Sequence, residues 1–543
     1  MAQTPSGQTP ARPNIVLIMV DDMGFSDIGC YGSEIPTPNL DRLARGGIAF
    51  SQMYNCARCC PTRASILTGL YPHQAGVGGM THDFGRPAYQ GYLNDSCVTL
   101  AEALRAGGYR TYMSGKWHCG GPYDTRRPEA WSPGDPTHPT PVTRGFDEHY
   151  GMLCGGGSYF HPPTLCHNDR FVQPDHEGYY FTDAISDHAV RMIGQAHAHR
   201  DPFDEAQGRP FFLYVAYTAP HWPLHAPAET VERYRGRYAG GWDAVRTARH
   251  ERLKASGLLD PKWPISPRDP SAPPWEDIAD RDIEDARMAV YAAQLDRMDA
   301  GVGGILDKLD ELGIADDTMV IFLSDNGGCH EFLDARADWC GNLKTPLPDG
   351  REMKMGNLPG LLPGPDDTYQ SYNAPWANAS NTPFRLFKHW VHEGGIATPL
   401  IVRFPEVARP GGICHVVSHV IDILPTCLDA AGVEYPEQYA GRAVTPAQGR
   451  SLMPFLRRKQ DRDRRILFWE HEGNLAVRDG RWKLVAKWDR TTGPWELYDM
   501  AADRTELNDL AAAKPDKARE LAALHARWAE SIGAVPWEQV LAR

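Results

Sequence analysis

The chain has 543 residues, of which 42% are hydrophobic and 23% are charged, and this composition excludes a disordered protein. It is longer than the roughly 250–300 residues at which one hydrophobic core stops growing, so we expect one large domain and one smaller domain. The net charge is −13, so we predict no nucleic-acid partner.

Short apolar runs alternate with helical patterns along most of the chain. The predicted helices are Pro38–Ala44, Leu100–Ala106 and Asp282–Leu312. This alternation predicts an α/β protein with a large, mostly parallel sheet flanked by helices. The predicted strands are Asn14–Val20, Tyr109–Met113, Phe211–Tyr217, Met319–Leu323 and Pro399–Phe404.

Two long stretches interrupt this pattern. Asp201–Asp280 is rich in Pro, Trp and charged residues, and Asp334–Asn381 is rich in Pro and Gly. We interpret both as surface excursions, which in an enzyme often shape the substrate cleft and otherwise are variable loops.

The C-terminal part has a different pattern, with short strand-like runs and a hairpin signal at Asp479-Gly480. A helix is predicted at Asp516–Ile532. We therefore place a catalytic α/β domain at residues 1–445 and a smaller antiparallel sheet with a terminal helix at residues 446–543. The predicted strands here are Ile466–Glu470, Leu475–Arg478, Trp482–Trp488 and Trp495–Tyr498.

Polar side chains follow four of the predicted strands. Each alone is an ordinary turn or surface residue, but ligands of α/β sheets bind beyond the carboxyl ends of the strands, so four such ends together indicate a site. In chain order these residues are Asp21, Asp22, Lys116, His118, His221, Asp325 and Asn326.

Three carboxylates and one amide among them form an all-oxygen set. Such a set suits a hard cation, Ca²⁺ or Mg²⁺, whereas zinc favours His and Cys. The predicted metal ligands are Asp21, Asp22, Asp325 and Asn326.

The 12 cysteines are too few for a disulfide scaffold in a chain of this length. The single C-x-x-C pairing, from Cys56 to Cys59, has no second pair that would complete a zinc site, and a thioredoxin-like redox motif is its other interpretation. No segment is apolar enough to span a membrane and the start lacks a signal-peptide core. These features predict a cytoplasmic protein without membrane partners, or a periplasmic or secreted one if a signal peptide has been removed.

The segment from Cys59 to Gly69 reads C-C-P-T-R-A-S-I-L-T-G. From composition alone it is a Cys-containing loop that enters a helix near Pro61. The pattern C-x-P-[ST]-R-x-x-x-L-T-G resembles the signature of the type I sulfatases of the alkaline phosphatase superfamily. In that family the first Cys is oxidised to formylglycine, and here it is Cys59, because Pro stands two positions later.

The resemblance extends over most of the chain. It includes the opening strand with its Asp pair, G-K-W-H ending at His118, P-H at His221, S-D-N-G from Ser324, and Lys388 followed by E-G-G-I. The stretch Asn378–Phe404 is most similar to bacterial arylsulfatases. Two departures are small: Thr62 stands where Ser is common, and Ala397 where Arg is frequent.

The resemblance implies a sulfuric ester hydrolase of the arylsulfatase type that acts on a small-molecule sulfate ester, with Ca²⁺ favoured over Mg²⁺ and a formylglycine-generating enzyme as maturation partner. A hydrated aldehyde offers one hydroxyl to attack sulfur and a second whose deprotonation expels sulfate. The resemblance assigns diol binding to Arg63 and Lys116, proton acceptance to His118, and sulfate binding with leaving-group assistance to His221 and Lys388. The catalytic set is Cys59, Arg63, Lys116, His118, His221 and Lys388.

Three other functions stay open from the sequence. A phosphonate monoester hydrolase or phosphodiesterase of the same superfamily would use the same formylglycine. A non-catalytic binding protein would retain the fold, and a polysaccharide sulfatase would stack sugars on Trp and Tyr side chains of the long stretches.

Overall fold

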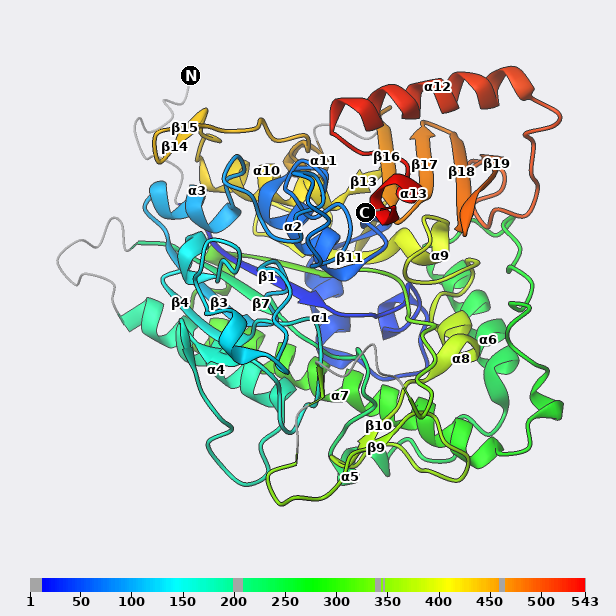
Figure 1. Ribbon diagram of the computed structural model, residues 1–543, viewed down its shortest axis with the longest axis horizontal. Helices are drawn as coiled ribbons and strands as arrows, with labels where there is room; N and C mark the ends of the chain where they lie inside the picture. Colours follow the sequence, from blue (N-terminus) through cyan, green and yellow to red (C-terminus); the bar gives the residue numbers. More distant parts are fainter. Residues whose placement is uncertain (1–11, 199–208, 337–342, 345–346, 459–463, 543) are drawn as a thin grey trace, which may run out of the picture.

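The computed structural model describes residues 12–198, 209–336, 343–344, 347–458 and 464–542. An eleven-stranded sheet runs through the centre of the molecule in the order β12-β2-β11-β8-β1-β7-β3-β4-β5-β6, and β13 also pairs with β2 (Figure 1). This arrangement confirms the predicted class, a mostly parallel sheet flanked by helices.

The middle of the sheet consists of buried parallel strands, and three of them, β1, β7 and β8, have nearly continuous apolar sequences, as strands covered on both faces do. β1 pairs with β7 on one side and with β8 on the other, and β3 and β4 continue the sheet beyond β7. The strands are β1 (Asn14–Val20), β3 (Arg110–Gly115), β4 (Glu148–Met152), β7 (Phe211–Ala216) and β8 (Thr318–Ser324).

The two sides of the sheet are less regular. β11 (Ala397–Arg403) replaces the predicted strand Pro399–Phe404 and runs antiparallel to both β8 and β2 (Ile48–Tyr54). The prediction missed β2, which contains Ser51 and Gln52 and is not a purely apolar run. The remaining edge strands are β5 (Leu165–His167), β6 (Arg170–Phe171), β12 (Gly412–Cys414) and β13 (Ser418–His419).

Helices cover both faces of the sheet (Figure 1). On one face α4 packs on α7, β3 and β7, and α1 packs on α7 and β11; on the other, α2 packs on α3 and α10. α3 begins with a capping box in which Thr99 and Glu102 bond to each other's backbone N–H groups. The helices are α1 (Pro38–Gly46), α2 (Cys59–Thr68), α3 (Leu100–Ala106), α4 (Phe181–Ala198), α7 (Arg281–Glu311) and α10 (Ile423–Ala431).

The C-terminal residues form the predicted antiparallel sheet, in the order β16-β17-β18-β19, covered by α12 (Figure 1). Its inner side chains, among them Leu467, Trp469 and Val485, belong to the same hydrophobic core as the main sheet. The domain boundary at residue 445 stays a prediction. The elements are β16 (Ile466–His471), β17 (Asn474–Asp479), β18 (Trp482–Asp489), β19 (Thr491–Asp499), α12 (Pro515–Ser531) and α13 (Trp537–Leu541).

The two long stretches contain more structure than a surface excursion. α6 (Gly241–Ser256) lies in the first and buries Trp242 and Arg249, and α8 (Asn373–Ser380) lies in the second and buries Trp376. Residues 201–208, 337–342 and 345–346 of these predictions lie outside the described residues. The small elements are α5 (Ala228–Val231), β9 (Lys354–Met355), β10 (Thr368–Tyr369), α9 (Glu393–Ile396), β14 (Gln438–Tyr439), β15 (Arg442–Ala443) and α11 (Met453–Leu456).

Among the helices in the described part of the chain, none has both the length and the apolar character needed to cross a bilayer.

Candidate active site

The four strands that the sequence singled out, β1, β3, β7 and β8, lie side by side, so their carboxyl ends meet at one edge. Backbone hydrogen bonds continue past the strand ends and fix the loops. The Lys116 amide donates to the Ala216 carbonyl (2.8 Å), and the Asp325 amide donates to the Val20 carbonyl (3.1 Å). The backbone positions of the polar residues that follow the strands are therefore fixed by these hydrogen bonds.

Gly115, which precedes Lys116, allows β3 to approach β7 at this edge. Its φ is +119°, and a Cβ at this position would lie 2.0 Å from the Ala216 carbonyl oxygen. Only glycine fits such a close approach of two backbones. The close approach of the two strands therefore explains why glycine is required at the first position of the G-K-W-H motif, independently of any role in catalysis.

A network of buried charges occupies the bottom of the site. Arg63, from the second turn of α2, contacts Asp325 Oδ2 through one terminal nitrogen at 2.8 Å and reaches Asp21 Oδ2 at 3.2 Å. Lys116 Nζ donates to the same oxygen of Asp21. All four side chains are fully buried, so each charge depends on its partners for stability.

Asp22 forms the second half of this network. Lys388 Nζ lies 2.8 Å from Asp22 Oδ1, and Asn326 Nδ2 donates to that oxygen at 2.7 Å. His221 Nε2 lies 3.5 Å from Asp22 Oδ2. Lys388 comes from the loop between α8 and α9, so three separate segments of the chain converge on one carboxylate.

The oxygen atoms left over in this network fit a bound cation. Asp21 Oδ1 and Asn326 Oδ1 are buried without a hydrogen-bond partner, an expensive arrangement unless something positive lies against them. Burial, and after it the neighbouring Asp21, hold the pKa of Asp325 well above its usual range. Carboxylate and amide oxygens are the ligands that Ca²⁺ and Mg²⁺ prefer.

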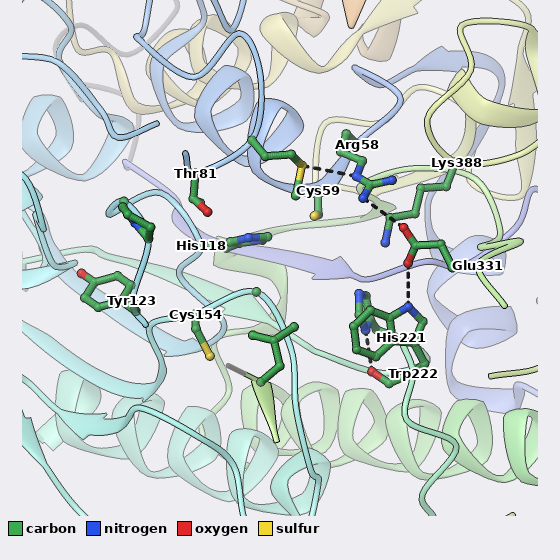
Figure 2. A pocket seen from close by; sticks show the side chains of 15 residues that line it. Arg58, Cys59, Thr81, His118, Tyr123, Cys154, His221, Trp222, Glu331 and Lys388 are labelled. Carbon is green, nitrogen blue, oxygen red and sulfur yellow. Dashed lines mark hydrogen bonds and ion pairs between the residues drawn. The ribbon is translucent and has the colours of Figure 1, made fainter. Parts of the chain in front are cut away.

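Cys59 is the first residue of α2 and faces a pocket of about 210 Å³ beside this network (Figure 2). Figure 2 shows His118 and Lys388 on either side of the Cys59 side chain and His221 below them. The pocket is lined by Arg58, Cys59, Met80, Thr81, His118, Gly121, Pro122, Tyr123, Cys154, Gly155, His221, Trp222, Glu331, Leu343 and Lys388.

The surroundings of Cys59 stabilise negative charge. A hydrogen bond from Cys60, together with His118 and Lys116, lowers the pKa of the Cys59 thiol well below its usual range, although burial opposes this. Burial also lowers the pKa of His118 to about 4, so its imidazole is neutral near pH 7. A nitrogen of His118 lies within 4.8 Å of Cys59 Sγ, which places a proton acceptor beside residue 59.

All ten residues that the sequence nominated therefore lie in the pocket or in the charge network beneath it. The sequence reasoning missed one further group, the ion pair between Arg58 and Glu331 (3.0 Å), to which the Trp222 indole donates at 2.8 Å (Figure 2). Arg58 and Trp222 directly adjoin Cys59 and His221, and this adjacency was the available signal. No sequence signal linked Glu331 to either of them.

Comparison with known proteins identifies the architecture. Residues 13–433 match the sulfatase family, and residues 384–532 match the family described as "N-sulphoglucosamine sulphohydrolase, C-terminal". The chain belongs to the sulfatase family. It is 33% identical to an uncharacterized sulfatase of Schizosaccharomyces pombe, over 94% of this chain and 92% of that protein. It is 32% identical to an arylsulfatase of Klebsiella aerogenes, over 81% of this chain and 91% of that protein.

Solved structures share the fold of this sulfatase. One, Ps i-CgsB in complex with k-i-k-neocarrahexaose, superimposes with a TM-score of 0.64 at 24% identity, over 95% of this chain and 92% of that one. Another, in complex with its substrate D-glucosamine-2-N,6-O-disulfate, gives a TM-score of 0.60 at 21% identity, over 96% and 98%. The predicted family is confirmed, and the chain is a sulfuric ester hydrolase. Formylglycine and calcium are typical of this family.

Proposed function

We propose that this sulfatase hydrolyses compact sulfate monoesters of the aryl type, with a nucleophile made from Cys59. The observation that carries the proposal is the position of Cys59. It begins a buried helix, faces the pocket and lies beside the buried network of carboxylates, lysines and arginine that the family resemblance predicts. The similarity to an arylsulfatase supports the same conclusion.

Two groups would complete the site. Asp21, Asp22, Asp325 and Asn326 would hold a divalent cation, with Ca²⁺ favoured, and the cation would supply positive charge to sulfate oxygens and lower the pKa of a nearby hydroxyl. Formylglycine at position 59 would supply, once hydrated, one hydroxyl to attack sulfur and a second to release sulfate. A formylglycine-generating enzyme would be the partner that makes it.

Arg63 and Lys116 would orient the groups around residue 59. Both cations already lie against Asp21, so their positive charge stays at the floor of the pocket through every step. Fixed charges of this kind stabilise developing negative charge without having to reorganise during the reaction.

His118 would take the proton whose removal releases sulfate. Its pKa of about 4, lowered by burial, keeps the imidazole unprotonated near neutral pH and ready to accept. A neutral histidine beside the reacting group is the usual arrangement for general-base catalysis.

His221 and Lys388 would bind sulfate oxygens and assist the departing alcohol. For this role the His221 imidazole would carry a proton on both nitrogens: Nδ1 donates to the Trp222 carbonyl at 2.6 Å, and Nε2, which faces Asp22, would donate to a sulfate oxygen or to the departing oxygen. Burial lowers the pKa of His221, and the charge of Asp22 opposes this. Asp22 is the strongest of the groups that outweigh burial and hold the pKa of Lys388 well above its usual range, which keeps this lysine charged.

The upper wall of the pocket supports an apolar leaving group. Met80, Pro122, Tyr123 and Leu343 line it, and its charged residues, Arg58 and Glu331, neutralise each other. These features favour an aryl sulfate over a long sulfated polysaccharide.

The experiment is peptide mass spectrometry of the Cys59 segment combined with steady-state kinetics. Conversion of the thiol to the aldehyde removes about 18 Da, a loss that hydration reverses. We expect conversion, together with a higher kcat/KM for a phenyl sulfate than for a phenyl phosphonate or a phosphodiester. An active preparation with unmodified Cys59 would overturn the proposed nucleophile, and a preference for the phosphorus esters would overturn the proposed substrate class.

A further inference from the structure

The turn between β16 and β17 of the C-terminal sheet contacts His389, the residue that directly follows Lys388 of the pocket lining. On one side of the ring, His389 Nδ1 lies 3.2 Å from Glu472 Oε2. On the other side, Asn474 Nδ2 lies 3.2 Å from His389 Nε2. The imidazole is held between two side chains of the turn.

The direction of these hydrogen bonds is fixed by the backbone around Asn474. The Trp488 amide donates to Asn474 Oδ1 at 2.9 Å, so the NH₂ group of Asn474 is the one that faces His389. Nε2 of His389 therefore accepts, and Nδ1 carries the proton that is donated to Glu472. Although His389, His471 and Glu472 lie close enough together to suggest a metal site, this tautomer leaves His389 no free lone pair for a cation.

His389 connects the turn to two catalytic segments. It follows Lys388 directly, and its backbone amide donates to the Ala57 carbonyl at 2.8 Å, two residues before Cys59. Both His389 (φ +90°) and Ala57 (φ +62°) have left-handed backbone conformations that side-chain-bearing residues rarely adopt. Such conformations persist only where the surrounding contacts enforce them.

The sequence of the turn departs from the residue preferences of tight hairpin turns. Glu472 (φ +47°) and Gly473 (φ +83°) both have positive φ, as in the tight hairpin turns that favour Asn, Asp or Gly at the first position. A glutamate at this position is therefore unfavourable for the backbone conformation. The neighbouring groups explain its presence: although burial opposes ionisation, His471, His389 and Arg58 lower the pKa of Glu472 to about 2, so the carboxylate is charged.

We propose that Glu472 and Asn474 are positioning residues of the sulfatase reaction, which hold Lys388 and the Cys59 segment in place through His389. A second contact acts on the same segment, since the Trp469 indole of β16 donates to the Asn55 carbonyl at 2.8 Å. The C-terminal sheet therefore contributes to catalysis without touching substrate. This inference rests on the proposed roles of Cys59 and Lys388.

The decisive variant is Glu472→Gly, because it separates stability from positioning. Glycine suits the positive φ of the turn, and this relief offsets the loss of the Glu472–His389 contact, so we expect a Tm close to that of the wild type. Removal of the carboxylate frees the His389 ring, so we expect kcat/KM to fall about tenfold or more, as small misplacements of catalytic groups do. Asn474→Ala should lower kcat/KM to a similar extent. All rates are normalised to the converted fraction of Cys59, measured by peptide mass.

Arg490→Gly is the matched control. Arg490 forms the turn between β18 and β19 of the same sheet, also has positive φ (+61°), and is exposed. We expect its kcat/KM to remain within twofold of that of the wild type. In a double-mutant cycle, Glu472→Gly should lower kcat/KM by a smaller factor in a Lys388→Ala background than in the wild type, because one of the positioned groups is already absent.

Glu472→Gly and Asn474→Ala with wild-type kcat/KM would overturn the positioning role. So would parallel losses of Tm and activity in Glu472→Gly, since these would indicate a purely structural turn. The underlying assignment is tested separately, because undiminished activity of Lys388→Ala would refute the role of Lys388 whatever the turn variants do.

Discussion

The floor and the upper wall of the pocket are built in different ways. The floor consists of residues that follow adjacent parallel strands, together with Arg63 from α2 and Lys388 from the loop before α9, and its buried charges contact one another in one network. The wall comes from loops, and it combines apolar side chains with the ion pair of Arg58 and Glu331. Changes in the floor should therefore affect the chemical step, and changes in the wall should affect the choice of substrate.

The largest effect should follow removal of the nucleophile. Cys59→Ala cannot be converted to an aldehyde, and we expect kcat to fall by about 10⁴-fold or more, as in other enzymes that lose a nucleophile. The measurement is steady-state hydrolysis of an aryl sulfate. Cys427→Ala is a suitable control, since Cys427 is also buried but packs in α10 away from the pocket. Substantial activity in Cys59→Ala would refute the nucleophile.

Metal removal should have the next largest effect. Chelation, or Asp325→Asn, should lower kcat/KM by at least about 100-fold, because a Lewis-acid cation supplies several kcal/mol. Chelation should also lower the Tm, because the cation stabilises the folded state alone. Adding back Ca²⁺ or Mg²⁺ to the chelated wild type, with activity and Tm as readouts, identifies the ion. A fully active chelated enzyme with no residual metal would contradict the predicted site.

His118 should determine the acid limb of the pH profile. The base must be neutral to act, and because its pKa is about 4, we expect kcat/KM to hold down to about pH 5 and to fall below pH 4. A histidine with an ordinary pKa near 6.5 would instead lose activity already below about pH 6.5. His118→Ala should lose about 10²- to 10⁴-fold in rate together with this limb. Retention of the limb in the variant would assign it to another group.

The smallest effect should come from the wall. Glu331→Gln removes the negative charge that neutralises Arg58, so the upper pocket becomes cationic. We expect kcat/KM for 4-carboxyphenyl sulfate, relative to phenyl sulfate, to rise about fivefold, as expected for one charge at a partly screened site. An unchanged ratio would show that the Arg58–Glu331 pair does not influence the leaving group.

Much of the floor was predictable because its residues directly follow parallel strands, and the common direction of these strands places their carboxyl ends at one edge of the sheet. The runs before Asp21 and Asp325 are apolar throughout, as buried parallel strands are, and parallel strands end at the same edge. The family motif around Cys59 then added the nucleophile and Arg63, and the separate resemblance at Lys388 followed by E-G-G-I added that lysine. The positions of these residues agree with the prediction, and their roles stay predictions.

The remainder depended on contacts that leave no local pattern. β2 was missed because its polar residues Ser51 and Gln52 break the apolar run. The antiparallel direction of β11 could not be predicted, because the apolar sequence of a buried strand does not depend on the direction in which the strand pairs. α6 was taken for surface because it is rich in charged residues, yet its Arg249 is buried against Asp27 and Glu34. The ion pair at the pocket wall joins residues that are far apart in sequence.

The burial of Cys59 has a consequence for the timing of synthesis. Only 2% of its surface is exposed in the folded chain, and the segment before it is held by Trp469 and, through His389, by the β16–β17 turn. These strands are synthesised after the Cys59 segment. We therefore expect that segment to remain loosely held until they have been made and folded, and the proposed maturation enzyme would have its best opportunity before then.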